Sequence, residues 1–230
     1  MRKKIHALTP NFKRFRWIIH SLSVNSFTRT LQYELLNTFE NLGDVLDFGG
    51  GSKICYRKDL NCNSYKSINI DKKAEPTWLI NIDDPLPNLK SKFDTIISLN
   101  TIEHIYEPSK LFHQLFNALK PGGQILISTP FLFPIHACPD DFFRPTPSWY
   151  RRTLIFCGFH NIDVVPLVWG PFSSASLVSG MPGPFKKFRM KIFLLADLVY
   201  FYLSTRKIST LNFENRQEKH ATAFFVRAIK

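Results

Sequence analysis

Cysteine is scarce in this sequence, and the spacing of the cysteines disfavours both a disulfide-stabilised protein and a cysteine-based metal site. The four cysteines, Cys55, Cys62, Cys138 and Cys157, form no C-x-x-C pair. We therefore expect reduced thiols in a cytoplasmic protein and no disulfide framework. Cys157 and His160 have a ligand-like spacing, but no second pair matches them, so we predict no metal site.

Long apolar runs are also absent. No clean stretch of about 20 apolar residues occurs, and we expect no membrane-spanning helix. The basic start of the chain is interrupted by Lys13, Arg14 and Arg16, so we expect no signal peptide. The apolar fraction of 44% is nevertheless ordinary for a globular protein with a full core.

Acidic residues are missing from one end of the chain. Residues 1–30 carry seven Lys or Arg and no Asp or Glu, and residues 184–230 carry ten basic residues against three acidic ones. Residues 31–183 are slightly acidic, with thirteen basic residues against fifteen acidic ones. The net charge of +12 therefore belongs to the two ends. This predicts an anionic partner for the ends: a membrane surface, nucleic acid or a phosphorylated substrate.

Short apolar runs alternate with amphipathic segments along the rest of the chain. This alternation predicts an α/β fold with a doubly wound, Rossmann-like seven-stranded sheet. The expected strands lie within 44–51, 64–71, 77–87, 93–100, 124–131, 160–169 and 221–230. The expected helices span 27–41, 107–123, 146–159 and 185–203, with Thr146 capping the third and Gly158 ending it. We expect a basic arm at residues 1–30 and a single domain at 31–230.

Polar residues end several of the expected strands. Asp47, Asp71 and Asn100 follow three of them, and the pair Asp83-Asp84 follows another. An acid at such a place often only caps the next helix. In parallel sheets, however, ligands bind beyond the carboxyl ends of the strands, and several polar strand ends at one edge favour a ligand site.

A glycine turn, Gly49-Gly50-Gly51, directly follows the first expected strand. A dinucleotide site would need a third glycine where Ile54 stands, and Asp47 would repel a pyrophosphate. S-adenosylmethionine has no phosphate and presents cationic and donor groups. Asp47 can favour its amino-acid end, and Asp71 can accept both ribose hydroxyls. The residue types therefore favour this cofactor.

The ordered motifs VLDFGGGS, INID, NIDD, FDTIISLNTIEHI and LKPGGQILISTP resemble the class I S-adenosylmethionine-dependent methyltransferases of the type 11-like group. The resemblance covers roughly residues 40–169, and ATAFFVRAIK resembles the final antiparallel strand of that fold. It implies a cofactor site with adenine close to Ile82 and Asp83 and the methionine moiety beside Asn100. The residues implied at this site are Asp47, Gly49, Gly50, Gly51, Asp71, Ile82, Asp83 and Asn100.

Two segments are candidates for the methyl-transfer site. His104 follows the fourth expected strand and is expected to face the methyl group, unless it only bonds to backbone. The pattern H-x-x-P-x-D-x-x-R at His136, Asp141 and Arg144 is similar to a subgroup that methylates sugar hydroxyls in bacterial surface-polysaccharide synthesis. His136 would be the base, Asp141 would orient it, and Arg144 would bind a carboxylate or phosphate. Alternatively, these three residues only hold the loop together.

An insertion at residues 170–212 precedes the last expected strand. It begins with a flexible Gly/Pro/Ser loop and continues with the helix at 185–203, in which basic residues lead into an apolar run whose one charge is Asp197. Such a helix suits the surface of an anionic membrane. A substrate cap or a dimer contact is the alternative.

The leading hypothesis is an O-methyltransferase for a sugar hydroxyl on a glycan or lipid-linked saccharide, peripheral at the inner membrane face. An RNA methyltransferase is the second, because basic arms with aromatic residues also suit nucleic acid. A non-catalytic partner subunit that binds S-adenosylmethionine is the third.

Overall fold

The computed structural model describes residues 4–81, 84–136, 139–180, 183–205 and 210–230. Contacts between residues group the chain into two units. Unit 1 comprises Met1–Leu35, Pro130–Ile135 and Val165–Phe224, and unit 2 comprises Leu36–Thr129, His136–Val164 and Phe225–Lys230. The division into an arm at 1–30 and a single domain at 31–230 stays a prediction.

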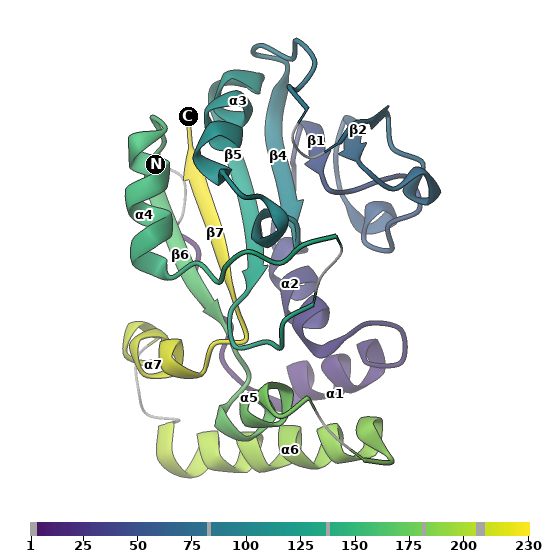
Figure 1. The fold of residues 1–230 in the computed structure, drawn as a ribbon. Helices are drawn as coiled ribbons and strands as arrows, with labels where there is room; N and C mark the ends of the chain where they lie inside the picture. The colour runs from purple at the N-terminus through teal and green to yellow at the C-terminus, as the bar shows by residue number, and fades with distance from the viewer. Residues whose placement is uncertain (1–3, 82–83, 137–138, 181–182, 206–209) are drawn as a thin grey trace. The chain divides into compact units, whose positions relative to one another are not determined.

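Seven strands form one sheet in the order β3-β2-β1-β4-β5-β7-β6, which confirms the predicted Rossmann-like α/β fold. The strands are β1 (Asp44–Phe48), β2 (Ser64–Asn69), β3 (Trp78–Leu79), β4 (Phe93–Leu99), β5 (Leu119–Pro130), β6 (His160–Leu167) and β7 (Ala223–Ile229). β1 pairs in parallel with β2 and β4, and β4 pairs in parallel with β5. The amide of Gly122 donates to the carbonyl of Lys230, and that of Phe131 donates to Thr222, so β7 runs antiparallel to β5 (Figure 1).

The central strands are apolar on both faces, as expected for a parallel sheet that is covered on both sides. The side chains of Leu46, Ile96 and Ile97 are fully buried, and so is that of Leu126 on β5. Because β1, β4 and β5 are buried at their carboxyl ends, the polar groups at these ends are held on a rigid edge.

Two helices of unit 2 follow β4 and β5, namely α3 (Pro108–Ala118) and α4 (Pro147–Phe156). The side chain of Thr146 accepts a hydrogen bond from the amide of Trp149, which confirms the predicted cap of α4. The expected helix at 107–123 was too long, because β5 already begins at Leu119. Pro121 explains the difference, since it disfavours helical backbone at the residue before it. Three short 3-10 turns also occur: η1 (Arg57–Asp59), η2 (Lys72–Ala74) and η3 (Ile102–His104).

Unit 1 contains most of the remaining helices. These are α1 (Phe12–Ser21), α2 (Phe27–Leu36), α5 (Pro171–Val178), α6 (Lys186–Tyr200), the π-helical turn η4 (Phe201–Thr205), α7 (Thr210–Gln217) and η5 (Glu218–His220). The expected helix at 27–41 ends five residues early, where Asn37 and Thr38 follow, and both are weak helix formers.

The predicted flexible loop after residue 170 was wrong, because it contains α5. The carboxylate of Asp197, on α6, accepts hydrogen bonds at 2.8 Å from the amides of Phe172 and Ser173. It thereby supplies the acceptor that the start of α5 lacks in its own sequence. Asp197 is buried, and α5 packs against α6 in Figure 1. The one acid of the apolar run therefore has a structural role.

Some of the basic residues near the start of the chain are bound within unit 1. The guanidinium of Arg14 donates to both carboxylate oxygens of Glu34 at 2.6 Å and lies 5.2 Å from the ring of Trp169. Arg14 therefore stabilises the fold of this unit. Among the described residues, no helix combines the length and the hydropathy needed to cross a bilayer.

Candidate functional site

The glycine turn after β1 lies in close contact with the segments that follow two neighbouring strands. Gly49 has a φ of +96°, which favours glycine, and a side-chain carbon there would lie 2.0 Å from Oγ1 of Thr101. A side-chain carbon at Gly51 would lie 2.1 Å from the carbonyl oxygen of Ala74. The turn thus joins the ends of β1, β2 and β4, and only backbone fits at this place.

Asp47 lies beneath this turn and is fully buried. A side-chain carbon at Gly50 would lie 2.1 Å from its carboxylate. Oδ2 of Asp47 accepts hydrogen bonds from the hydroxyls of Tyr56, at 2.6 Å, and Tyr65, at 2.7 Å. Burial raises the pKa of Asp47 to about 6, although both tyrosines oppose the rise.

The surroundings of the second carboxylate oxygen of Asp47 indicate whether the turn fits S-adenosylmethionine. Oδ1 is buried and accepts no hydrogen bond from any residue that the structure describes. A buried carboxylate under a glycine turn favours a cationic ligand and disfavours a phosphate. The residues present therefore fit an ammonium-bearing, phosphate-free cofactor.

Asn69, at the end of β2, was not among the predicted site residues. Its amide nitrogen donates to the carbonyls of Gly49, at 2.8 Å, and Gly50, at 3.1 Å, and its Oδ1 accepts from the amide of Asp71. Asn69 thus connects the glycine turn with the segment of Asp71. Its position two residues before Asp71, in the motif INID, was the signal that could have identified it.

The structure places Asp71 at the exposed edge of the site. Its Oδ1 caps η2 by accepting from the amide of Lys73 at 2.8 Å, and Oδ2 accepts no hydrogen bond within the described chain. Asp71 can thus both cap the turn and offer an oxygen to a ligand. Ile82 and Asp83 lie outside the described residues.

Asn100, directly after β4, has left-handed backbone with a φ of +52°. The backbone amide of Asn100 donates to the carbonyl of Ser128 on β5 at 2.8 Å. Asparagine tolerates this conformation better than most residues, but the backbone still stores strain, which is common at functional sites. The chain then turns into η3, which carries Glu103 and His104.

Glu103, His104 and His136 come together beyond the ends of β4 and β5. One ligand-type atom of each lies within 4.8 Å of the other two. Oε1 of Glu103 is 3.8 Å from Nε2 of His104 and 3.9 Å from Nε2 of His136. Glu103 is fully buried, whereas the side chain of His136 is 37% exposed. Both histidines were among the predicted site residues, whereas Glu103 was not.

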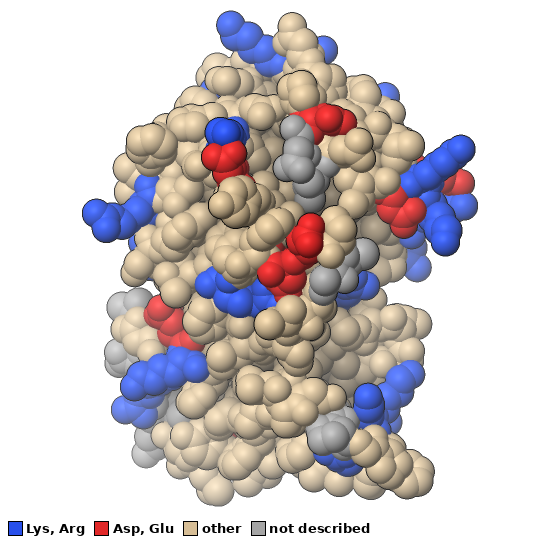
Figure 2. All heavy atoms as spheres, viewed as in Figure 1, with Lys and Arg blue, Asp and Glu red and all other residues tan. Residues whose placement is uncertain are grey.

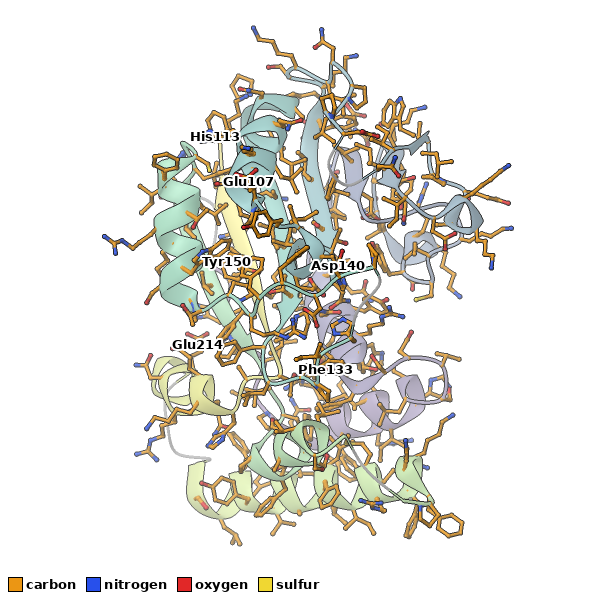
Figure 3. All side chains as sticks on the ribbon, viewed as in Figure 1. Glu107, His113, Phe133, Asp140, Tyr150 and Glu214 are labelled. Atoms are coloured by element: carbon orange, nitrogen blue, oxygen red, sulfur yellow. The ribbon has the colours of Figure 1, made fainter. Side chains whose placement is uncertain are left out.

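In each histidine of this cluster, Nε2 faces Glu103 and Nδ1 contacts a second group. Nδ1 of His104 contacts the backbone carbonyl of Asp140, which is labelled in Figure 3. Nδ1 of His136 lies 3.3 Å from Oδ2 of Asp141. The two rings meet edge to face, with centroids 5.3 Å apart. The predicted histidines therefore share one site, although 32 residues separate them in the chain.

Asp141 and Arg144 form a bidentate pair in the same loop. Oδ1 and Oδ2 of Asp141 accept from the two terminal nitrogens of Arg144, and Oδ2 also accepts from the amide of His136 at 2.9 Å. The Arg144 guanidinium lowers the pKa of Asp141 to about 2. The loop network that was one of the two alternatives is therefore present. A role for Arg144 toward a substrate stays a prediction.

Next to the cluster, α4 is anchored to β5. Tyr150, labelled in Figure 3, places its hydroxyl 2.6 Å from Oγ1 of Thr129. Burial, opposed by this bond and reinforced by the charge of Glu103, raises the pKa of Tyr150. Tyr150 is therefore a neutral partner that fixes the loop between β5 and α4 at its helical end.

A glycine turn above a buried acid, a polar strand-end edge and an antiparallel last strand define the architecture of class I methyltransferases. The chain belongs to the methyltransferase domain family, whose sequence profile matches residues 23–152. The predicted class of enzyme is thereby confirmed at the level of the family.

The chain is also similar to curated proteins over short segments. It is 35% identical over 68 residues to the tRNA U34 carboxymethyltransferase of Campylobacter curvus, and 39% identical over 74 residues to that of Campylobacter fetus. These matches cover 30% and 32% of this chain, and the chain spans only 23% and 24% of the two relatives.

Solved structures share the fold at low sequence identity. A methyltransferase of Mesorhizobium loti has a TM-score of 0.52 and 14% identity, with 91% of this chain and 100% of that chain covered. The [4+2]-cyclase SpnF has a TM-score of 0.55 and 13% identity, with 98% and 87% covered. Because a cyclase shares the fold, the fold alone does not define an activity, and the residues of the site decide it.

Proposed function

We propose that this methyltransferase domain transfers a methyl group from S-adenosylmethionine to a hydroxyl oxygen of a saccharide. One observation carries the proposal: two imidazoles and a buried carboxylate gather on the strand-end edge that also holds the glycine turn and Asn100. A hydroxyl is a weak nucleophile, and a basic group near the acceptor is what its methylation requires.

S-adenosylmethionine supplies an electrophilic methyl group when it is bound. The family and the fit of Asp47 support this cofactor. A phosphoethanolamine N-methyltransferase of Haemonchus contortus, which has a TM-score of 0.50 to this chain at 14% identity, was solved with S-adenosylmethionine; 93% of this chain and 60% of that chain are covered. Asp47 and the glycine turn would hold the amino-acid end, and Asp71 the ribose.

His136 is the candidate base for the acceptor hydroxyl. It is the more exposed of the two histidines, so an acceptor can reach its ring. Asp141, ionised down to low pH by its pair with Arg144, orients the imidazole and stabilises the imidazolium that forms when a proton is taken up.

The outer face of α6 supports a membrane surface as the place of action. Apolar side chains recur on it every three or four residues, and we call Phe188, Ile192, Leu195 and Val199 the apolar face of α6. These four side chains are 50–64% exposed, although the opposite face of α6 is already buried in unit 1. An exposed apolar stripe opposite a buried face of the same helix is suited to a second apolar environment.

The charges around this face favour an anionic membrane over a second protein copy. Every exposed side chain of α6, a helix that the structure describes completely, is either basic or uncharged: Lys186, Lys187, Phe188, Lys191, Ile192, Leu195, Val199 and Tyr200. Figure 2 shows few charged side chains over the α6 region. Two copies facing each other would bring lysines together, whereas anionic headgroups would neutralise them. A lipid-linked saccharide would meet the enzyme there.

The experiment that tests this proposal is an acceptor screen that measures S-adenosylhomocysteine. Lipid-linked saccharides and nucleotide sugars are offered to the full chain, with His136→Ala as the inactive control. We expect turnover with a saccharide hydroxyl that depends on His136. Turnover with unmodified tRNA but with no saccharide would overturn the proposed acceptor class.

RNA is the second candidate acceptor because of the curated relatives. Both are enzymes named for tRNA U34, and the basic ends of this chain would suit a polyanion. The matches cover less than a third of this chain, so they carry less weight than the α6 surface. Salt-dependent gel shifts with tRNA, compared with pelleting on anionic vesicles, discriminate between the two acceptor classes.

A further inference from the structure

The ring nitrogens of His104 allow its protonation to be assigned. Nδ1 contacts the backbone carbonyl of Asp140, and a carbonyl only accepts hydrogen bonds. Nδ1 therefore carries a hydrogen, and in a neutral ring Nε2 presents its lone pair. That lone pair faces Oε1 of Glu103 at 3.8 Å, a separation beyond hydrogen-bonding range. Two electron-rich atoms so placed favour a cation between them.

His136 also directs Nε2 toward Glu103, but its Nδ1 lies close to both an acceptor and a donor. Its Nδ1 lies 3.3 Å from Oδ2 of Asp141 and 3.4 Å from a terminal nitrogen of Arg144. An arginine nitrogen only donates, so the Arg144 contact requires a lone pair on Nδ1, whereas the Asp141 contact requires a hydrogen there. An ion bound at Nε2, which lies 3.9 Å from Oε1 of Glu103, would select the second of these two tautomers. Asp141 and Arg144 neutralise each other, so this loop adds little net charge to the cluster.

We propose that Glu103, His104 and His136 bind a divalent transition-metal ion through one carboxylate oxygen and the two Nε2 atoms. Two histidines and one carboxylate are a ligand set for Mn, Fe, Co, Ni and Zn. Acceptors at Nδ1, here the Asp140 carbonyl and the Asp141 carboxylate, are the partners that orient metal-binding histidines.

The distances in the cluster fit such an ion after a contraction. Ligand atoms about 2.1 Å from one ion lie roughly 3.0–3.4 Å apart at tetrahedral or octahedral angles. The separations of 3.8 and 3.9 Å from Glu103 therefore require contractions of roughly 0.4–0.9 Å, and the two histidines, whose ligand atoms lie within 4.8 Å, require at most roughly 1.8 Å. Since His136 is partly exposed, one side of the ion would stay open to an acceptor oxygen. The 32-residue separation of the histidines explains why spacing alone did not indicate this site.

The catalytic role of the ion rests on the proposed function, whereas the binding of the ion to the protein does not. A hydroxyl bound to a divalent cation is more acidic than a free one. Its proton would pass to solvent while the oxygen forms its bond to the methyl carbon and the carbon–sulfur bond of the donor breaks. The histidines would then act as ligands, and the general base would no longer be His136.

Metal binding can be measured on the full chain without donor or acceptor. The protein is treated with EDTA, dialysed and titrated with Mn²⁺, Co²⁺ or Zn²⁺ by calorimetry, and Co²⁺ absorption reports the ligands. We expect one ion per chain, and at least a 10-fold weaker affinity in both His104→Ala and His136→Ala. Glu103→Gln, which keeps the side-chain shape, is expected to lose the ion as well.

The matched control is His113→Ala. His113, labelled in Figure 3, lies on α3 and packs against Phe156, away from the cluster. It is expected to bind the ion as the wild type does. Absence of stoichiometric binding, or binding that both histidine variants retain, would overturn the inference.

Measurements of turnover distinguish a failure of the metal site from a failure of the proposed function. Methyl transfer that EDTA leaves unchanged would contradict the ion and keep His136 as a simple base. Stoichiometric binding of the ion in a chain that methylates no hydroxyl would support the metal site and count against the proposed acceptor.

Discussion

The hydroxyl of Tyr65 donates a hydrogen bond at 2.7 Å to Asp47, a fully buried carboxylate under the glycine turn. Tyr56 donates to the same oxygen. Two neutral donors only partly replace the water that Asp47 would have when exposed. The site therefore keeps a negative charge that costs stability and suits a cationic ligand.

Asp47→Asn is expected to stabilise the free protein and to weaken cofactor binding. The pKa of Asp47 is about 6 when folded and near 3.8 when unfolded, so the folded state binds the proton more tightly. The free energy of unfolding therefore falls as the pH rises from about 4 to 6, by up to about 3 kcal/mol. Asparagine keeps an oxygen for both tyrosines but carries no charge.

Urea denaturation between pH 4.5 and 8 checks this prediction. We expect Asp47→Asn to be more stable than the wild type by about 1–3 kcal/mol above pH 6, with affinity for S-adenosylmethionine reduced more than 10-fold. A variant that is less stable than the wild type at pH 8 would show that the buried charge is not the dominant effect.

The pKa of Asp141 is shifted in the opposite direction to that of Asp47. Its folded pKa of about 2 lies below the unfolded value near 3.8, so its contribution is present above pH 4 and is lost as the pH falls toward 2. Asp141→Asn should lower the free energy of unfolding at pH 7 by about 2 kcal/mol. Asp140→Asn is the control, because the contact of Asp140 to His104 is made by its backbone carbonyl. Equal stability of the two variants at pH 7 would refute the prediction.

His136→Ala is expected to lower turnover by a factor of 10² to 10⁴ and to change the affinity for S-adenosylmethionine less than threefold. The reason is that His136 lies in the Glu103 cluster, whereas the glycine turn contacts Thr101, Ala74 and Asn69. Steady-state kinetics and calorimetry give the two numbers, with His113→Ala as the control. Unchanged turnover on the true acceptor would remove His136 from the reaction.

The apolar face of α6 is expected to bind anionic membranes. Ile192→Ser combined with Leu195→Ser should reduce binding to vesicles that contain anionic phospholipid by at least 10-fold, because both side chains are 50% exposed and contribute apolar area. Ile155→Ser on α4 is the control, since Ile155 is 64% exposed but lies outside this face. Vesicle pelleting at two salt concentrations measures the effect. Equal loss in the control would indicate non-specific adhesion.

Local sequence patterns predicted the parts of the fold that depend on local chemistry. The cap at Thr146 and the glycine turn could be predicted because the residues that form them are close in sequence. Helix α5 could not, since the acceptor for its first amides is Asp197, about 25 residues later in the chain. The early start of β5 likewise depends on pairing with β4, through Phe93 and Leu119, which overrides the helical period.

The candidate site shows the same division. Polar strand ends predicted Asp47, Asp71 and Asn100 at one edge, because parallel strands deliver their ends to the same edge, and their role toward the cofactor stays a prediction. The association of His104 with His136 depends on how the loop after β5 folds back over η3, where the amide of Phe142 donates to the carbonyl of Glu103. No short-range pattern encodes that contact.

Calorimetric titration of S-adenosylmethionine into the wild type and Asp71→Ala tests the central claim most directly. The account predicts one site per chain, and a loss of affinity of more than 10-fold when the exposed carboxylate beyond β2 is removed. Near-normal affinity of Asp71→Ala, or tight binding of a dinucleotide in place of S-adenosylmethionine, would contradict it.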